Sequence, residues 1–179
     1  MFLRQRTDLF DGKPKRLLHV APERELGARL SRIRGVTYLS ADMVAKRAIL
    51  KIDLTAIDQP DGTFDVICCS HVLEHIPDDR RAMVELCRIL KPGGWAILQV
   101  PIGGETTYED PQIQTPEARE EAFGQWDHVR VYGKDFRDRL EESGFRVRVE
   151  PFAANFGEIQ CTRLGILASE DVYFCTKPK

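Results

Sequence analysis

Short apolar runs alternate along the chain with segments whose apolar residues recur every three to four positions. The run at residues 16–21 has the length and composition of a buried strand. Behind it, Leu26 and Leu30 repeat at helical spacing, Pro22 opens that helix at its first turn, and Gly35 ends it. The pattern therefore predicts a strand followed by a helix.

The same alternation continues to the C-terminus. Further strands are predicted at residues 36–40, 49–54, 64–69, 95–101, 145–150 and 171–176, and further helices at residues 77–90 and 135–142. Strands that alternate with helices favour the α/β class, in the form of a doubly wound, mostly parallel sheet with helices on both faces. We expect one domain over residues 1–179.

Residues 103–132 interrupt this rhythm. The segment is polar, contains Gly103 and Gly104 followed by Pro111 and Pro116, and is longer than an ordinary connection. We therefore predict a long loop that acts as a mobile lid after the fifth strand.

Composition narrows the class of protein. Of the 179 residues, 42% are hydrophobic and 30% charged, as in ordinary globular proteins. No apolar run approaches the roughly 18 residues of a membrane helix, and the N-terminus lacks the apolar core of a secretory signal, so a cytoplasmic protein is expected. The five cysteines show no C-x-x-C spacing, and we expect them to be reduced and buried.

Charge is distributed unevenly. Residues 1–51 carry 12 Lys and Arg against 5 Asp and Glu, although the whole chain has a net charge of −2. Two interpretations stay open: a solvated basic helix face, or a positive rim for an anionic substrate such as a phosphorylated or nucleic-acid group.

A family signature covers the fourth predicted strand and the helix after it. The stretches FDVICCSHVLEHIPDD (residues 64–79) and AMVELCRILKPGG (residues 82–94) resemble the class I S-adenosylmethionine-dependent methyltransferases of the type 11 group. The resemblance extends over residues 15–150. It implies a seven-stranded Rossmann-like sheet with an antiparallel last strand, and S-adenosylmethionine as cofactor.

The resemblance also assigns roles to residues at the strand ends, where such sheets bind ligands. It implies that Asp42 binds the ribose hydroxyls, that Asp53 accepts from the adenine amino group, and that Leu54 packs beside the ring. Ser70 and His71 match the segment that lines the methionine part. Asp42 as a turn or helix cap, and Asp53 as a solvated loop acid, remain the alternatives.

The first loop departs from the family pattern. The usual glycine-rich loop is replaced by His19-Val20-Ala21-Pro22-Glu23. The sequence resembles a subset of the group that carries this LHxAPE variant together with a DHVRxYG stretch, which is Asp127–Gly133 here. We place His19, Ala21, Pro22 and Glu23 among the cofactor-binding residues. Glu23 either contacts the methionine ammonium or complements the helix dipole.

A second departure is the short segment before the first strand. Only about 15 residues precede it, whereas class I enzymes usually carry covering helices there. Either the site is open, or the loop 103–132 and a partner, for instance a second copy of the chain, cover it.

A metal site is suggested by the spacing His71-x-x-Glu74-His75, because positions i, i+3 and i+4 share one helix face. Zinc peptidases have the same spacing, but on a long helix, and peptidase chemistry is not expected here. Some ubiquinone-pathway and small-RNA O-methyltransferases hold a divalent ion with a similar cluster, to which His128 would be added. This imidazole-rich set favours zinc or a transition metal over magnesium. The alternative is a hydrogen-bonded brace without metal.

Two functions follow from these observations. The first is methyl transfer to an O or N atom, with His71, His75 or His128 as base. The second is a cofactor-binding or regulatory domain without turnover, which the glycine-free first loop favours. The acceptor is left open among a small molecule, an anionic group and nucleic acid.

Overall fold

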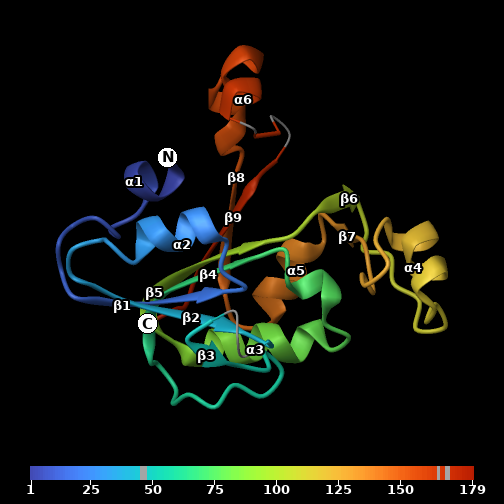
Figure 1. Cartoon of the computed structure of the whole chain (residues 1–179), viewed down its shortest axis with the longest axis horizontal. Helices are drawn as coiled ribbons and strands as arrows, with labels where there is room; N and C mark the ends of the chain where they lie inside the picture. Colours follow the sequence, from blue (N-terminus) through green and yellow to red (C-terminus); the bar gives the residue numbers. More distant parts are fainter. Residues whose placement is uncertain (45–47, 165, 168–169) are drawn as a thin grey trace.

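A seven-stranded sheet forms the centre of the computed structural model, which describes residues 1–44, 48–164, 166–167 and 170–179. Its strand order is β3-β2-β1-β4-β5-β9-β8 (Figure 1). The first five strands pair in parallel, whereas β9 is antiparallel to both neighbours. The strands are β1 (Lys15–Val20), β2 (Val36–Asp42), β3 (Leu50–Lys51), β4 (Phe64–Ser70), β5 (Leu90–Gln99), β8 (Arg146–Glu150) and β9 (Val172–Thr176). The predicted α/β sheet with an antiparallel last strand is confirmed.

Helices cover both faces of the sheet. α1 (Phe2–Arg6) and α2 (Arg24–Leu30) lie on one face, and α3 (Asp79–Ile89) lies on the other, with α5 (Phe136–Glu142) packed into the same core as α3 (Figure 1). The period of two along β1 separates the two cores: Leu17 packs under α1 and α2, and Leu18 packs under α3. Burial of each such leucine stabilises the fold by about 1.5–3 kcal/mol.

Two predicted elements are shorter than expected. α2 ends at Leu30, and a turn rather than helix leads to Gly35, whose φ of +84° is left-handed. The third strand covers only two of the residues predicted at 49–54. Its extension is prevented because the Asp53 carboxylate accepts from the backbone N–H of Thr55 at 2.8 Å, which turns the chain away from the sheet.

The segment predicted as a loop at 103–132 contains regular structure. It holds α4 (Pro116–Phe123), and β6 (Ile102–Gly104) and β7 (Tyr132–Gly133) pair at its base (Figure 1). Thr115 caps α4 with its hydroxyl, Pro116 occupies the first turn, and Gly124 ends the helix in a left-handed conformation. The prediction of an irregular loop was wrong, because these end signals flank a helix with little apolar periodicity.

The connection from β8 to β9 contains two more elements absent from the prediction, η2 (Phe152–Asn155) and α6 (Glu158–Leu164). α6 projects from the body of the molecule (Figure 1), whereas Phe152 and Ala153 of η2 are buried, with Phe152 against Phe2 of α1. Among the described residues no helix is long and apolar enough to cross a membrane. All five cysteines are free and buried, as predicted.

Candidate functional site

A cavity of about 430 Å³ opens where β1, β2 and β4 end. From β1 the chain continues to β2 on one side, and from β4 it continues to β5 on the other side, so the strand order reverses between β1 and β4. Doubly wound folds bind ligands at such a point. The walls of this cavity are mainly apolar. The lining residues are Val20, Ala21, Ala41, Asp42, Met43, Ile52, Asp53, Leu54, Thr55, Val72, His75, Ile76, Pro77 and Asp78.

Two carboxylates enter this cavity from separate strand ends. Asp42 is half-buried and uses one oxygen to accept from the backbone N–H of Val44 at 2.7 Å. Asp53 accepts from the hydroxyl and the backbone N–H of Thr55, and these hydrogen bonds lower its pKa below the usual range. Both acids therefore offer the cavity an oxygen acceptor, and Leu54 adds a buried apolar wall.

Two residues that end neighbouring strands have left-handed backbone conformations. Ala21 follows β1 with φ +46°, and its N–H donates to the carbonyl of Ala41. His71 follows β4 with φ +54°, and its N–H donates to Gln99. This conformation costs a non-glycine residue roughly 1–2 kcal/mol, and such strain collects at functional sites. Both residues lie at the ligand-binding edge of the sheet.

His19, Pro22 and Glu23 of the first loop do not line the cavity, whereas Val20 and Ala21 do. His19 is 1% exposed, so it has no surface to offer a cofactor. Its ring nitrogens lie 2.7 Å from Glu23 and 3.1 Å from the Tyr38 hydroxyl. Glu23 makes no side-chain cap for α2, although it occupies the N-cap position. Its carboxylate is bonded to His19 instead of to the helix end.

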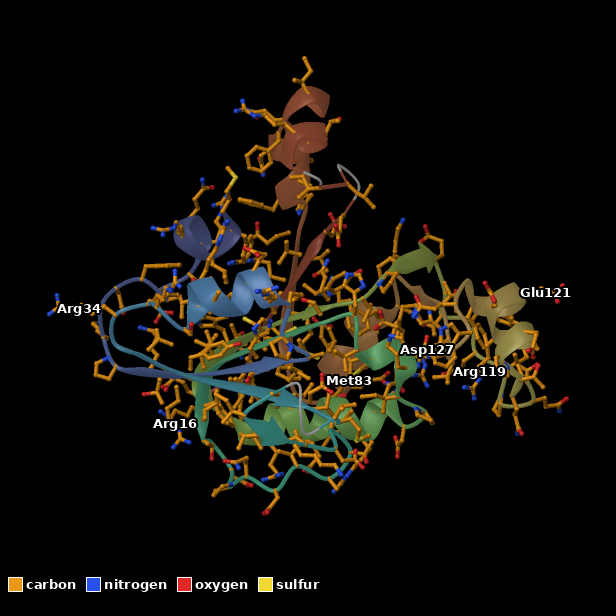
Figure 2. The ribbon with its side chains drawn as sticks, in the orientation of Figure 1. Arg16, Arg34, Met83, Arg119, Glu121 and Asp127 are labelled. Atoms are coloured by element: carbon orange, nitrogen blue, oxygen red, sulfur yellow. The ribbon has the colours of Figure 1, made fainter. Side chains whose placement is uncertain are left out.

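Glu74, His75 and His128 form a compact group of ligand-type side chains, with atoms within 4.8 Å of one another. The rings of His75 and His128 are 4.7 Å apart, and His75 Nδ1 lies 3.3 Å from an Asp127 oxygen. Figure 2 shows Asp127 between α4 and the body of the molecule.

Glu74 is 2% exposed, and neither of its carboxylate oxygens has a hydrogen-bond partner among the residues that the structure describes. A buried carboxylate without partners is costly, which makes this position suited to a cation. His71 approaches Glu74 at 3.5 Å from the exposed side but does not belong to the group of three. The structure thus unites three of the four predicted ligands.

The DHVRxYG stretch binds the loop that carries Glu74 and His75. Arg130 is 3% exposed, and its guanidinium donates to the carbonyls of Leu73, Ile76 and Pro77 at 2.5–3.1 Å. The backbone N–H of Val129 donates to the carbonyl of Glu74. This part of the segment is therefore held firmly against the cavity wall.

A second cavity, of about 410 Å³, lies beyond His71 at the end of β5. Its polar lining includes Gln99 and Lys134, besides His71. His71 and Val72 are consecutive, and Val72 lines the first cavity, so the two cavities are neighbours across this loop.

Among the described residues of the basic N-terminal region, residues 1–51, no Lys or Arg lines either cavity. Arg4, Arg29, Arg32 and Arg34 line a separate groove between α1 and α2. Arg34 lies at the end of the molecule opposite Asp127 (Figure 2). Of the two open interpretations, a positive rim around either of these cavities does not apply to these four arginines.

Comparison with known proteins identifies the family. A family model of a methyltransferase domain matches residues 2–150. The chain belongs to this family, and its fold is that of the class I S-adenosylmethionine-dependent methyltransferases.

Individual relatives resemble only parts of the chain. An uncharacterized methyltransferase of Mycobacterium sp. (strain KMS) is 31% identical over 97 residues, covering 51% of this chain and 31% of that protein. A ubiquinone biosynthesis O-methyltransferase of Albidiferax ferrireducens (strain ATCC BAA-621 / DSM 15236 / T118) is 39% identical over 46 residues, covering 26% and 18%. The chain thus spans less than a third of the length of these relatives.

A solved S-adenosylmethionine-dependent methyltransferase from Mesorhizobium loti has the same fold. It superposes with a TM-score of 0.61 at 15% identity, covering 91% of each chain.

The sequence did not point to every residue that builds the cavity. Ile76 and Pro77 line the first cavity although they carry no reactive group. Arg130 was noted only as part of a stretch, because nothing local in the sequence shows that it reaches the carbonyls of residues 73–77.

Proposed function

We propose that this protein is an S-adenosylmethionine-dependent methyltransferase that binds the adenosine part of the cofactor in the first cavity. The observation that carries this proposal is the pair Asp42 and Asp53, which reach one apolar cavity from two strand ends. Asp42 would accept from the ribose hydroxyls and Asp53 from the adenine amino group, while Leu54 and Ile76 pack beside the ring. The five free cysteines fit the reducing cytoplasm.

The methionine part of the cofactor would extend past Ala21 and Pro22 toward Ser70 and His71. The cofactor supplies a methyl group on a sulfonium, and transfer requires the acceptor atom to lie in line with it. The second cavity, across the His71 loop, gives the acceptor an approach to that point.

His71 is suited to take a proton from the acceptor, because its side chain is 56% exposed and lines the second cavity. His75 of the same loop and His128, whose ring lies 4.7 Å from that of His75, are the other candidates for this role. The relative named for ubiquinone biosynthesis is an O-methyltransferase, which favours a small acceptor with a hydroxyl group.

A divalent cation fits Glu74, His75 and His128, since the buried Glu74 carboxylate has no hydrogen-bond partner within the described part of the chain. A site with one carboxylate and two imidazoles favours zinc or another transition metal. Such an ion would act as a Lewis acid toward an acceptor oxygen. The chain itself contributes the ligands and Asp127, which would orient the His75 ring.

The cofactor proposal is tested by calorimetry with S-adenosylhomocysteine and the Asp42→Asn variant. The variant preserves the shape of the side chain but loses the charge that would bind the ribose. We expect affinity to fall about tenfold or more, since a hydrogen bond to a charged group is worth roughly 1.5–3 kcal/mol.

Asp58→Asn is the matched control, because Asp58 is exposed and outside the cavity lining. Equal affinities of Asp42→Asn and the control would refute the ribose contact. If the unmodified protein showed no binding at millimolar ligand, the whole proposal would fail. Binding without methyl transfer in single-turnover assays with phenols and amines would indicate a regulatory domain.

The metal proposal is tested by titrating the protein with Co²⁺ and recording its visible absorption. We expect a saturable band that is lost in His128→Ala and kept in His71→Ala, because only His128 belongs to the group of three. A band absent from the unmodified protein would instead support the hydrogen-bonded brace.

A further inference from the structure

His19 occupies an unusual place for an imidazole, inside the central strand β1. It is 1% exposed, and both of its ring nitrogens have partners on different elements. Nε2 lies 2.7 Å from Glu23 Oε2, and Nδ1 lies 3.1 Å from the Tyr38 hydroxyl of β2. The chain of contacts therefore runs from β2 through β1 to the start of α2.

The chemistry of the partners determines the direction of these hydrogen bonds for a neutral His19. The Glu23 carboxylate can only accept, so Nε2 carries the proton and donates to it. Nδ1 is then the acceptor and receives the proton of the Tyr38 hydroxyl. Burial raises the pKa of Tyr38, which keeps its hydroxyl protonated as the donor.

Gly27 on α2 provides the space for this arrangement. A Cβ at position 27 would lie 2.9 Å from the Tyr38 hydroxyl and 3.9 Å from His19 Nδ1. Any larger residue would therefore displace the hydroxyl from the imidazole.

The chain of contacts ends at the Glu23 carboxylate, which is partly exposed. The Glu23 side chain is 50% exposed, and it does not cap its own helix. The hydrogen bond from His19 and, more weakly, the nearby His71 keep the pKa of Glu23 below its ordinary value. Glu23 is thus an anion held by His19 after the end of β1, at the start of α2.

We infer that Tyr38 and His19 are positioning residues that fix Glu23 as the receptor for the ammonium group of the cofactor's amino-acid part. This inference rests on the proposed function and assigns a role to the first loop. In this loop the non-glycine residue Ala21 adopts a strained, left-handed conformation. The fixed side-chain carboxylate takes the place of a glycine-rich loop that could bring backbone groups close to the cofactor. Holding the carboxylate in advance reduces the entropy lost on binding.

Two ligands separate this role from a general effect on the fold. S-adenosylhomocysteine carries the amino-acid part, whereas 5′-methylthioadenosine has the same adenosine and sulfur without it. We expect Tyr38→Phe to weaken S-adenosylhomocysteine about threefold to tenfold in calorimetry and to leave 5′-methylthioadenosine unchanged. Equal changes for both ligands, or none for either, would overturn the inference.

His19→Gln and His19→Asn form a matched pair. The Gln amide nitrogen replaces Nε2 and keeps the donor to Glu23, whereas the Asn amide reaches only the Nδ1 position. His19→Gln should retain more of the S-adenosylhomocysteine affinity than His19→Asn. In a Glu23→Gln background neither replacement should change the affinity for S-adenosylhomocysteine, since the anion is gone. Additive losses of affinity would contradict the role of His19 in holding Glu23.

The tautomer gives a readout that does not depend on ligand. ¹⁵N NMR of the imidazole should show His19 protonated at Nε2, and Tyr38→Phe should shift the Nδ1 resonance. A His19 protonated at Nδ1 alone would refute the proposed contacts from Tyr38 through His19 to Glu23, even if the variants fold poorly. If the unmodified protein bound neither ligand, the proposed function would fail instead, so the two failures are distinguishable.

Discussion

Arg130 offers the most direct test of how the DHVRxYG stretch supports the site. Its guanidinium donates to three carbonyls of the loop between β4 and α3 and forms an ion pair with Glu109 at 2.9 Å. Asp79 lies 3.6 Å away, and it also binds Arg139. Arg130→Met keeps most of the side-chain volume and removes every one of these interactions.

The cost of this substitution can be estimated from what it leaves behind. Removing one partner of a buried ion pair costs about 3–5 kcal/mol, because the other charge stays buried without compensation. Glu109 is partly exposed and retains Arg139, which moves the estimate toward the lower limit. Three carbonyls lose their donor as well. We therefore expect the free energy of unfolding to fall by about 3 kcal/mol.

Urea unfolding followed by circular dichroism measures this loss. Arg137→Met is the matched control: Arg137 lies on α5, is exposed, and pairs with Glu141 one helical turn away. We expect the control to change the free energy of unfolding by less than about 0.5 kcal/mol. A loss below about 1 kcal/mol in Arg130→Met would show that the loop 73–77 does not depend on the hydrogen bonds from Arg130.

Two further predictions concern other parts of the fold. Glu85 is buried and accepts from Arg88, which lowers its pKa, so it stabilises the protein above its unfolded pKa near 4.5 and loses this effect as pH falls. Glu85→Gln should thus be less stable than the unmodified protein at pH 7, and the difference should shrink below pH 4.5; a constant difference would contradict the linkage. Ala21→Gly relieves a left-handed strain of roughly 1–2 kcal/mol against a glycine penalty of roughly 0.5–1 kcal/mol. We expect slightly higher thermal stability, whereas a loss above about 1 kcal/mol would mean that the Ala21 methyl group is needed for packing.

The sequence was sufficient to predict the sheet and the edge of the sheet at which the first cavity lies. The near-continuous apolar run of β1 indicates a strand that is buried on both faces of the sheet. The spacing of Leu26 and Leu30 indicates a helix that is buried on one face, because positions i and i+4 share a helix face. Asp42 and Asp53 were expected together since parallel strands end at one edge of a sheet, and both line the same cavity.

Contacts between distant segments could not be predicted in this way. The bond from His19 to Tyr38 depends on the register of β1 and β2, in which His19 pairs with Ser40. Arg130 reaches carbonyls more than 50 residues away, and carbonyls carry no side-chain identity that a sequence could show. α4 was missed for a different reason: its stability derives from its ends rather than from an apolar face.

The two unusual stretches of the sequence, LHxAPE and DHVRxYG, meet in the structure through one loop. From the first stretch, Glu23 lies near His71, which adds to the effect of His19 in lowering the pKa of Glu23. His71 in turn lies 3.5 Å from Glu74, and the second stretch brings His128 to the group of Glu74 and His75. Both stretches therefore lie next to the same five residues after β4, residues 71–75, although more than 100 positions separate Glu23 from His128. Because this loop lies between the two cavities, its geometry determines how cofactor and acceptor would face each other.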